Sequence, residues 1–276
     1  MTIPNDFQFS QQHLQDYLDC PRRFELKYIQ KLAWPAIQNE PVLEIERHLL
    51  MGSQFHNMIH QYVLGLPPET IASQLYDLDL IRWWNNYLSH DPLSNLPHQR
   101  YSELTLSTPF LGYRIVGKFD LIAIKPEQEI VIVDWKTNRK RLPHKYLSVR
   151  LQTILYPFLL VSAGIHLNDG LRINPDQVRM VYWFTDFPAD PLIFPYNQEE
   201  FNHAQEYLCT MINRIIEKES GGYPLTQDEK TCQICKYRSF CDRGSIAGHN
   251  ADFSEIIEEQ LSGFLIDYEQ IGEIAF

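Results

Sequence analysis

The sequence predicts an α/β protein with one sheet flanked by helices. Apolar residues recur at helical spacing in the N-terminal third, the period changes to two near the middle, and helix and strand patterns alternate afterwards. With 276 residues, 44% of them hydrophobic, the chain can bury a large core. We therefore expect one elaborated domain over residues 1–248, with a helical insertion at about 66–100 and an acidic amphipathic tail over 249–276.

The N-terminal third is expected to be helical. Residues 10–28 form the first helix, with the serine at its start as N-cap and a break near Cys20, because the following proline disfavours a helical residue before it. Residues 44–62 form a second helix that carries His56. Two adjoining helices over 68–88 contain a pair of tryptophans, which we expect to pack internally.

A switch to period two near residue 101 marks the start of the sheet. Gly- and Pro-containing turns separate three runs in which apolar and polar residues alternate, so these runs predict an antiparallel meander. A helix, a further strand and a long helix opened by an asparagine N-cap follow. The predicted strands are 101–108, 113–124, 129–135 and 178–185, and the predicted helices are 149–163 and 197–218.

The charge balance argues against a polybasic nucleic-acid binder. The chain has 24 Lys and Arg against 35 Asp and Glu, a net charge of −11. Seven of the acids follow Arg243, after which no basic residue remains, so the rest of the chain is closer to neutral and can hold a local basic groove. The acidic tail either packs as a C-terminal helix or binds a partner. We find neither a signal-peptide pattern nor a stretch suited to span a bilayer, and expect a soluble, cytoplasmic protein.

Two carboxylates and a lysine form the first candidate site. Asp120 lies on the second predicted strand of the meander, while Asp134 and Lys136 share one face at the end of the third. Carboxylates that converge at a sheet edge bind hard cations such as Mg²⁺ or Mn²⁺, and an adjacent lysine can stabilise charge on a phosphoryl oxygen. The alternative is a solvated salt bridge between Asp134 and Lys136.

Three more segments turn this pair of acids into an ordered set. They are Gly52–His56 (G-x-x-x-H), Gly117–Asp120 (G-x-x-D) and Gln152–Tyr156 (Q-x-x-x-Y), and D-x-K at residues 134–136 stands between the last two. In this order the motifs resemble those of the PD-(D/E)XK nucleases of the RecB-like type. The resemblance implies a restriction-endonuclease-like fold, a mixed sheet flanked by helices, and metal-dependent hydrolysis of DNA.

By this resemblance, Asp120, Asp134 and the carbonyl of Trp135 would bind the metal. His56 would be a further ligand, and its imidazole would favour Mn²⁺ because it is softer than a carboxylate. A buried core histidine is the alternative, and for His60, one turn later, it is the preferred interpretation.

The remaining motif residues would complete the active site. Lys136 would be the catalytic lysine, and Gln152 and Tyr156 would organise the site and contact the nucleic-acid backbone. Glu103 resembles an acid often found in this family, and a strand-end glutamate that faces water is an equal alternative. Gln152 could also cap a loop, and Tyr156 could be a core residue.

The cysteines predict a metal centre. Their number is five, and no export signal accompanies them, which disfavours a disulfide framework. Cys232, Cys235 and Cys241 form C-x2-C-x5-C, and Cys20 lies far upstream. Four thiolates satisfy either zinc or a [4Fe–4S] cluster. Cys209 is expected to be a structural thiol.

The cysteine spacing also resembles the iron–sulfur nucleases of the AddB and CRISPR-associated RecB-like groups. In those groups one N-terminal cysteine joins three C-terminal ones, and the segment Cys20–Phe24 resembles their N-terminal signature. The resemblance implies a [4Fe–4S] cluster that staples the two ends of the chain, with zinc as the less favoured occupant.

A basic cluster follows the D-x-K motif and is expected to contact phosphates. The aromatic residues Tyr146, Tyr237 and Phe240 suggest single-stranded ends as substrate, because bases stack on such rings. A solvated loop is the alternative for the basic cluster. Its members are Arg139, Lys140, Arg141, Lys145 and Arg150.

The sequence therefore predicts a metal-dependent DNA nuclease, with exonuclease action on single-stranded or end-containing DNA preferred. Repair, recombination and CRISPR-type DNA processing are the candidate pathways, with a helicase or a CRISPR adaptation component as protein partner. The alternatives are a catalytically silent nucleic-acid-binding or assembly subunit with the same fold and cluster, and a zinc-stabilised interaction protein. The presence of Asp120, Asp134 and Lys136 together argues against the silent subunit.

Overall fold

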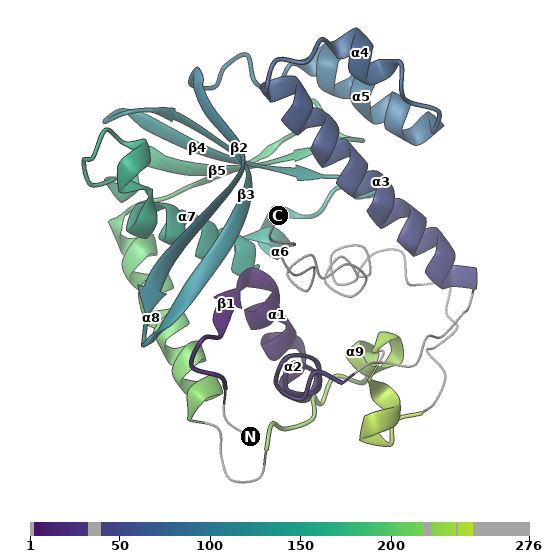
Figure 1. Cartoon of the computed structure of the whole chain (residues 1–276), viewed down its shortest axis with the longest axis vertical. Helices are drawn as coiled ribbons and strands as arrows, with labels where there is room; N and C mark the ends of the chain where they lie inside the picture. The colour runs from purple at the N-terminus through teal and green to yellow at the C-terminus, as the bar shows by residue number, and fades with distance from the viewer. Residues whose placement is uncertain (1–2, 33–39, 218–221, 236, 245–276) are drawn as a thin grey trace, which may run out of the picture. The chain divides into compact units, whose positions relative to one another are not determined.

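The computed structural model describes residues 3–32, 40–217, 222–235 and 237–244 (Figure 1). The chain forms two compact units. The first, here called the sheet unit, consists of residues 1–15 and 54–220, and the second, the cysteine unit, of residues 16–53 and 221–276. The predicted tail at 249–276 lies outside the described residues.

A six-stranded mixed sheet forms the centre of the sheet unit. The expected meander is confirmed, since β2 pairs antiparallel with β3 and β3 with β4. Two parallel pairings, β1 with β3 and β4 with β5, make the sheet mixed, and β6 closes it antiparallel to β5. The strands are β1 (Gln8–Ser10), β2 (Gln99–Phe110), β3 (Tyr113–Lys125), β4 (Glu129–Lys136), β5 (Val178–Phe184) and β6 (Leu192–Pro195).

One edge of β3 is shared by two different strands. β2 pairs with β3 along nearly all of its length, so β1 and β4 must both use the opposite edge. β1 occupies residues 114–116 of β3 and β4 occupies residues 121–125. Among the described residues, no strand pairs with the stretch 117–120 on this edge, and the stretch ends in Asp120.

Helices cover the sheet. Helix α7 packs against β2, β3 and β5, and α8 packs against α7 (Figure 1). The asparagine N-cap predicted for the long helix is confirmed, because Asn197 Oδ1 accepts the N–H of Glu200 at 2.9 Å. The α-helices are α1 (Gln11–Asp19), α2 (Pro21–Phe24), α3 (Glu40–Val63), α4 (Pro68–Ala72), α5 (Leu78–His90), α6 (His144–Ser148), α7 (Leu151–Ala163), α8 (Gln198–Ile216) and α9 (Glu229–Ile234).

Helical turns of other types complete the described chain. A π-helix, η1 (Glu25–Ile29), follows α2, so the predicted break at Cys20 separates α1 from a shorter α2 that continues as η1. Ser10 caps α1 as predicted, because its Oγ accepts the N–H of His13 at 3.3 Å. The 3₁₀ turns are η2 (Gly164–Leu167), η3 (Pro175–Gln177) and η4 (Arg238–Cys241).

An aromatic core anchors the helical insertion to β4 and β5. The tryptophans at 83 and 84 are each 1% exposed, which confirms their internal packing. Tyr87 packs edge-on against both Trp135 of β4 and Trp183 of β5. The α5 side chain of Asn86 also donates to the carbonyl of Thr185 at 2.8 Å. The insertion therefore supports the strand that carries the D-x-K motif.

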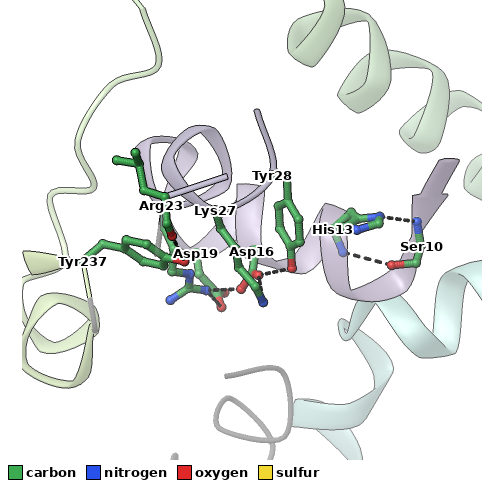
Figure 2. Close-up of polar contacts among 9 residues, drawn as sticks. Ser10, His13, Asp16, Asp19, Arg23, Lys27, Tyr28 and Tyr237 are labelled. Atoms are coloured by element: carbon green, nitrogen blue, oxygen red, sulfur yellow. Dashed lines mark hydrogen bonds and ion pairs between the residues drawn. The ribbon is translucent and has the colours of Figure 1, made fainter. Parts of the chain in front are cut away.

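Two cations, a buried arginine and a half-buried lysine, converge on a buried carboxylate in the cysteine unit (Figure 2). Asp16 Oδ1 lies 2.8 Å from Arg23 Nη2, and its Oδ2 lies 3.2 Å from Lys27 Nζ and accepts the Tyr28 hydroxyl at 2.6 Å. Asp19 pairs with the same Arg23 nitrogen at 2.8 Å. Burial by itself would raise the pKa of Asp16, but Arg23 and Lys27 outweigh burial and hold it below its ordinary value. The cluster ties α1 to α2 and η1.

No helix in the described part of the chain combines the length and the apolar character needed to cross a membrane.

Asp16→Asn is expected to lower the free energy of unfolding by about 3–5 kcal/mol near neutral pH, because it removes the buried carboxylate that pairs with both Arg23 and Lys27. The pKa of Asp16 is lowered in the folded state, so its contribution is present above the unfolded pKa and is lost as pH falls through the folded one. Urea denaturation of both proteins as a function of pH measures this difference.

The matched control is Asp79→Asn, because Asp79 makes an exposed ion pair with Arg82. We expect that variant to lose less than about 1 kcal/mol. If both variants lost the same free energy of unfolding, the Asp16 cluster would contribute no more to stability than an exposed ion pair.

Candidate active site

The site lies where β3 and β4 separate. Their pairing runs from Lys125 with Glu129 to Leu121 with Val133 and stops there, while β4 continues beside β5 to Lys136. At the next position the backbone N–H of Trp135 donates to Asp120 Oδ2 at 3.0 Å. The Asp120 carboxylate thus accepts the hydrogen bond that a backbone carbonyl of the neighbouring strand would otherwise accept. This separation leaves room for two carboxylates, Asp120 and Asp134, on adjacent strands.

Gly117 of the G-x-x-D motif allows α7 to approach β3 closely. A Cβ at this position would lie 2.8 Å from Leu159 Cδ2 and 3.5 Å from Tyr156 Cε1. A side chain here would displace the Leu159 side chain, so the glycine allows the close packing of α7 on β3 that presents Gln152 and Tyr156 to the carboxylates.

His56 links two of the predicted ligands. Its Nδ1 lies 3.2 Å from Asp120 Oδ1, and its Nε2 lies 3.0 Å from the carbonyl of Trp135. A carbonyl only accepts, so Nε2 carries a hydrogen, and the carboxylate favours a hydrogen on Nδ1 as well. Burial opposes the charged ring, but Asp120 outweighs burial and raises the pKa of His56 to about 9. The imidazolium is therefore the expected form at neutral pH.

Glu103 lies with His56 and Asp120. One ligand atom of each residue lies within 4.8 Å of the other two, and Lys118 Nζ lies 2.5 Å from Glu103 Oε2. Glu103 has a φ of 57°, a left-handed conformation that is costly for a residue other than glycine. The flanking residues of β2 stay paired with β3, so this local strain turns one side chain without breaking the strand.

Asp134 and Lys136 are held together by Gln152. Lys136 Nζ lies 3.0 Å from Asp134 Oδ2 and donates to Gln152 Oε1 at 2.9 Å. The amide nitrogen of Gln152 donates to Asp134 Oδ1. Burial raises the pKa of Asp134. The positive charge of Lys136 opposes this rise, and the negative charge of Asp120 adds to it. Two acids side by side, a buried Asp134 and a half-buried Asp120, therefore make a site that favours a bound cation.

Tyr156 closes the site from α7. Its ring packs on Phe119 with centroids 4.7 Å apart, and the side chain is 8% exposed. Burial, and then the charges of Asp134 and Asp120, raise its pKa, so its hydroxyl stays protonated and can donate a hydrogen bond.

The structure brings eight predicted residues of the sheet unit into one site. Carboxylate, carbonyl and imidazole donors suit Mg²⁺ and Mn²⁺ by their chemistry. The three residues whose ligand atoms lie within 4.8 Å of one another include Glu103. Asp134 is not among them, and it pairs instead with Lys136 and accepts a hydrogen bond from Gln152. The eight residues are His56, Glu103, Asp120, Asp134, Trp135, Lys136, Gln152 and Tyr156.

The predicted phosphate-contacting residues differ in their surroundings. Arg139, Lys140 and Lys145 are exposed. Arg141 makes an ion pair with Asp190 at 2.8 Å, and Arg150 is 9% exposed and lies over the ring of Tyr146. Asp190 is distant in the sequence, so no local signal identifies it as the partner of Arg141.

Four predicted cysteines gather in the cysteine unit. The N–H of Arg23 donates to Cys20 Sγ at 3.4 Å, and the guanidinium of Arg243 donates to Cys232 Sγ at 3.0 Å. Burial raises the pKa of Cys235 to about 11, although Arg23 opposes this shift, and its thiol interacts electrostatically with those of Cys20 and Cys241. Cys209 lies on α8 of the other unit. Among the described residues, no three cysteine sulfurs lie within 4.8 Å of one another.

Comparisons with known proteins give one family and two similar structures. A model of the PD-(D/E)XK nuclease superfamily matches residues 8–242. The chain is similar to a candidate exonuclease from Eubacterium rectale, with 10% identity and a TM-score of 0.46 over 88% of this chain and 90% of that one. It is also similar to a protein named SSO0001, with 14% identity and a TM-score of 0.35 over 85% and 95%. None of the curated proteins matches the chain.

Binding of Mn²⁺ near neutral pH is expected to release about one proton from His56. Its pKa is raised to about 9, so the ring is charged before binding, and metal affinity should fall as pH falls because protons compete for the same nitrogen. Calorimetry in buffers of different ionisation enthalpy measures the released protons.

His56→Gln should remove this release, and His60→Gln should retain it, because His60 Nδ1 bonds instead to Ser102 Oγ at 2.6 Å. Proton release that is unchanged in His56→Gln would exclude His56 as the source.

Proposed function

The chain belongs to the PD-(D/E)XK nuclease superfamily, and from this premise we propose that it is a metal-dependent deoxyribonuclease. The observation that carries the proposal is the convergence of Asp120, Asp134 and Lys136 where β3 and β4 separate. Charged groups that are buried or half-buried are costly for stability alone, so a bound cation and an anionic substrate best explain their presence here.

The donor set fits a divalent ion. His56, Asp120 and the Trp135 carbonyl already share contacts, and Glu103 and Asp134 add carboxylates. A bound Mg²⁺ or Mn²⁺ would supply Lewis-acid polarisation of the scissile phosphodiester.

The chain's own groups then orient the substrate. The ammonium of Lys136, held by Asp134 and Gln152, can donate to a phosphoryl oxygen as negative charge builds there. The protonated hydroxyl of Tyr156 can donate to a backbone phosphate from the α7 side. Because Gln152 contacts both Asp134 and Lys136, it keeps their spacing fixed.

The substrate we propose is DNA with a free end or a single-stranded segment. Exposed Arg139, Lys140 and Lys145 follow the catalytic strand and can contact phosphates, and Tyr146 offers a stacking face. The net charge of −11 favours a partner that helps to hold DNA, and a helicase or a CRISPR adaptation component would fit a RecB-like nuclease of repair, recombination or CRISPR-type processing.

Cleavage of end-labelled DNA with Mg²⁺ or Mn²⁺ tests the activity. Asp134→Asn and Lys136→Met should each lower the rate by about 100-fold or more, because each removes a buried charged group at the reacting centre. Single-stranded DNA, double-stranded DNA and RNA of the same sequence are compared in parallel.

Asp176→Asn and Lys125→Met are the controls, because they make the same charge changes at exposed positions. Wild-type protein that binds DNA but leaves every substrate intact would favour the silent binding subunit instead.

We further propose that Cys20, Cys232, Cys235 and Cys241 hold a [4Fe–4S] cluster. The four thiols lie close enough to interact electrostatically, and their C-x2-C-x5-C spacing with one distant N-terminal cysteine supports the cluster over zinc. The N–H donors at Cys20 and Cys232 are the contacts that tune cluster sulfurs. Such a cluster would join the helical segment after Cys20 to the segment that carries the other three cysteines.

Anaerobically purified protein is expected to contain iron and acid-labile sulfide, and Cys235→Ser should lose both. Cys209→Ser, which changes a cysteine on α8, should retain them. If the protein contains zinc and no iron, the four cysteines form a zinc site and the cluster proposal is wrong. A protein with neither metal would also overturn the proposal.

A further inference from the structure

Tyr182 lies beside the catalytic strand without belonging to any of its motifs. It pairs with Asp134 in the parallel register of β5 and β4, and its side chain is fully buried. Neighbours in a parallel pair present side chains on the same face, and Lys136 follows Asp134 by two residues on that face. Consequently the Lys136 ammonium lies over the Tyr182 ring, 5.2 Å from its centroid.

A chain of hydrogen bonds fixes the orientation of this ring. The Thr153 hydroxyl donates to the carbonyl of Leu147 at 2.6 Å, so its oxygen is left to accept from the Tyr182 hydroxyl 2.7 Å away. Thr153 is the residue after Gln152 on α7. The same turn of helix therefore holds the lysine directly through Gln152 and indirectly through the tyrosine ring.

These contacts restrict a side chain that is otherwise flexible. Lys136 is bounded by Asp134, by Gln152 and by the face of the Tyr182 ring, and a ring face attracts a desolvated ammonium. The carboxylate and the amide take specific hydrogen bonds, and the ring lies against a further side of the ammonium. Removal of the ring would leave the amine free to adopt other rotamers.

We propose that Tyr182, held by Thr153, is a positioning residue that fixes the Lys136 ammonium at the active site. This inference rests on the proposed nuclease function for its catalytic consequence, whereas the position of the ammonium is a property of the folded protein. In this role Tyr182 acts through Lys136.

The first test measures the position of the ammonium without any activity. In protein with ¹³C-labelled lysine, the Lys136 Cε–Hε signal is the one missing from the spectrum of Lys136→Arg. Because an aromatic ring face shields nearby protons, this signal should lie upfield of ordinary lysines in the wild type and in Tyr182→Phe. It should move to the ordinary position in Tyr182→Leu.

The second test measures cleavage. Tyr182→Leu should lower kcat by about tenfold or more, while KM for DNA and the half-saturating Mn²⁺ concentration stay the same, because only the lysine is displaced. Tyr182→Phe, which keeps the ring, should recover most of the lost rate. Phe9→Leu removes an equally buried ring from β1 and should leave kcat unchanged in the folded fraction.

The two tests separate the possible failures. A Lys136 signal and a kcat that are both unaffected by Tyr182→Leu would overturn the inference. If the wild type cleaves nothing, the nuclease proposal fails, and the resonance still decides whether the ring holds the ammonium. Should Tyr182→Leu not fold, Tyr182→Met, whose flexible side chain fills irregular space, carries the same expectations.

Discussion

The hydrogen bond from the Trp135 backbone to the Asp120 carboxylate is the contact on which the rest of the site depends. It stands where β3 exchanges one neighbour, β1, for another, β4. Because a side chain satisfies the donor there, the two strands can separate without a buried, unpaired N–H. The separation places Asp120 and Asp134 side by side and directs the Trp135 carbonyl to His56. The same change of neighbouring strand along β3 therefore shapes the sheet and forms the site.

Charge compensation explains how so many ionised groups can be buried near one another. In the metal-free protein the His56 imidazolium faces Asp120, and the Lys136 ammonium faces Asp134. Each acid therefore has a cation of the chain itself, which limits the desolvation cost. A divalent ion at this site would compete with the proton of His56 for its ring nitrogen and with Lys136 for the Asp134 carboxylate.

The cysteine unit uses the same principle with different donors. Asp16 is surrounded by Arg23 and Lys27, and Arg23 also interacts with the Cys235 thiol. A four-thiolate centre carries net negative charge with either zinc or an iron–sulfur cluster, so a buried guanidinium beside it favours the loaded form. In the proposed cluster, the N-terminal motif that begins at Cys20 would supply a ligand and, three residues later, a counter-charge.

The sequence by itself determined the local elements and the residue types of the site. Period-two runs predicted the meander, and D-x-K placed an acid and a lysine on one face, because these features depend only on neighbouring residues. Tertiary structure alone decided the parallel neighbours β1 and β5, the left-handed backbone of Glu103, the pairing of Arg141 with Asp190 and the tyrosine under Lys136. Each of these features is either a contact between segments far apart in the chain or a strained backbone dihedral angle. Neither kind of feature produces a periodic pattern in the sequence.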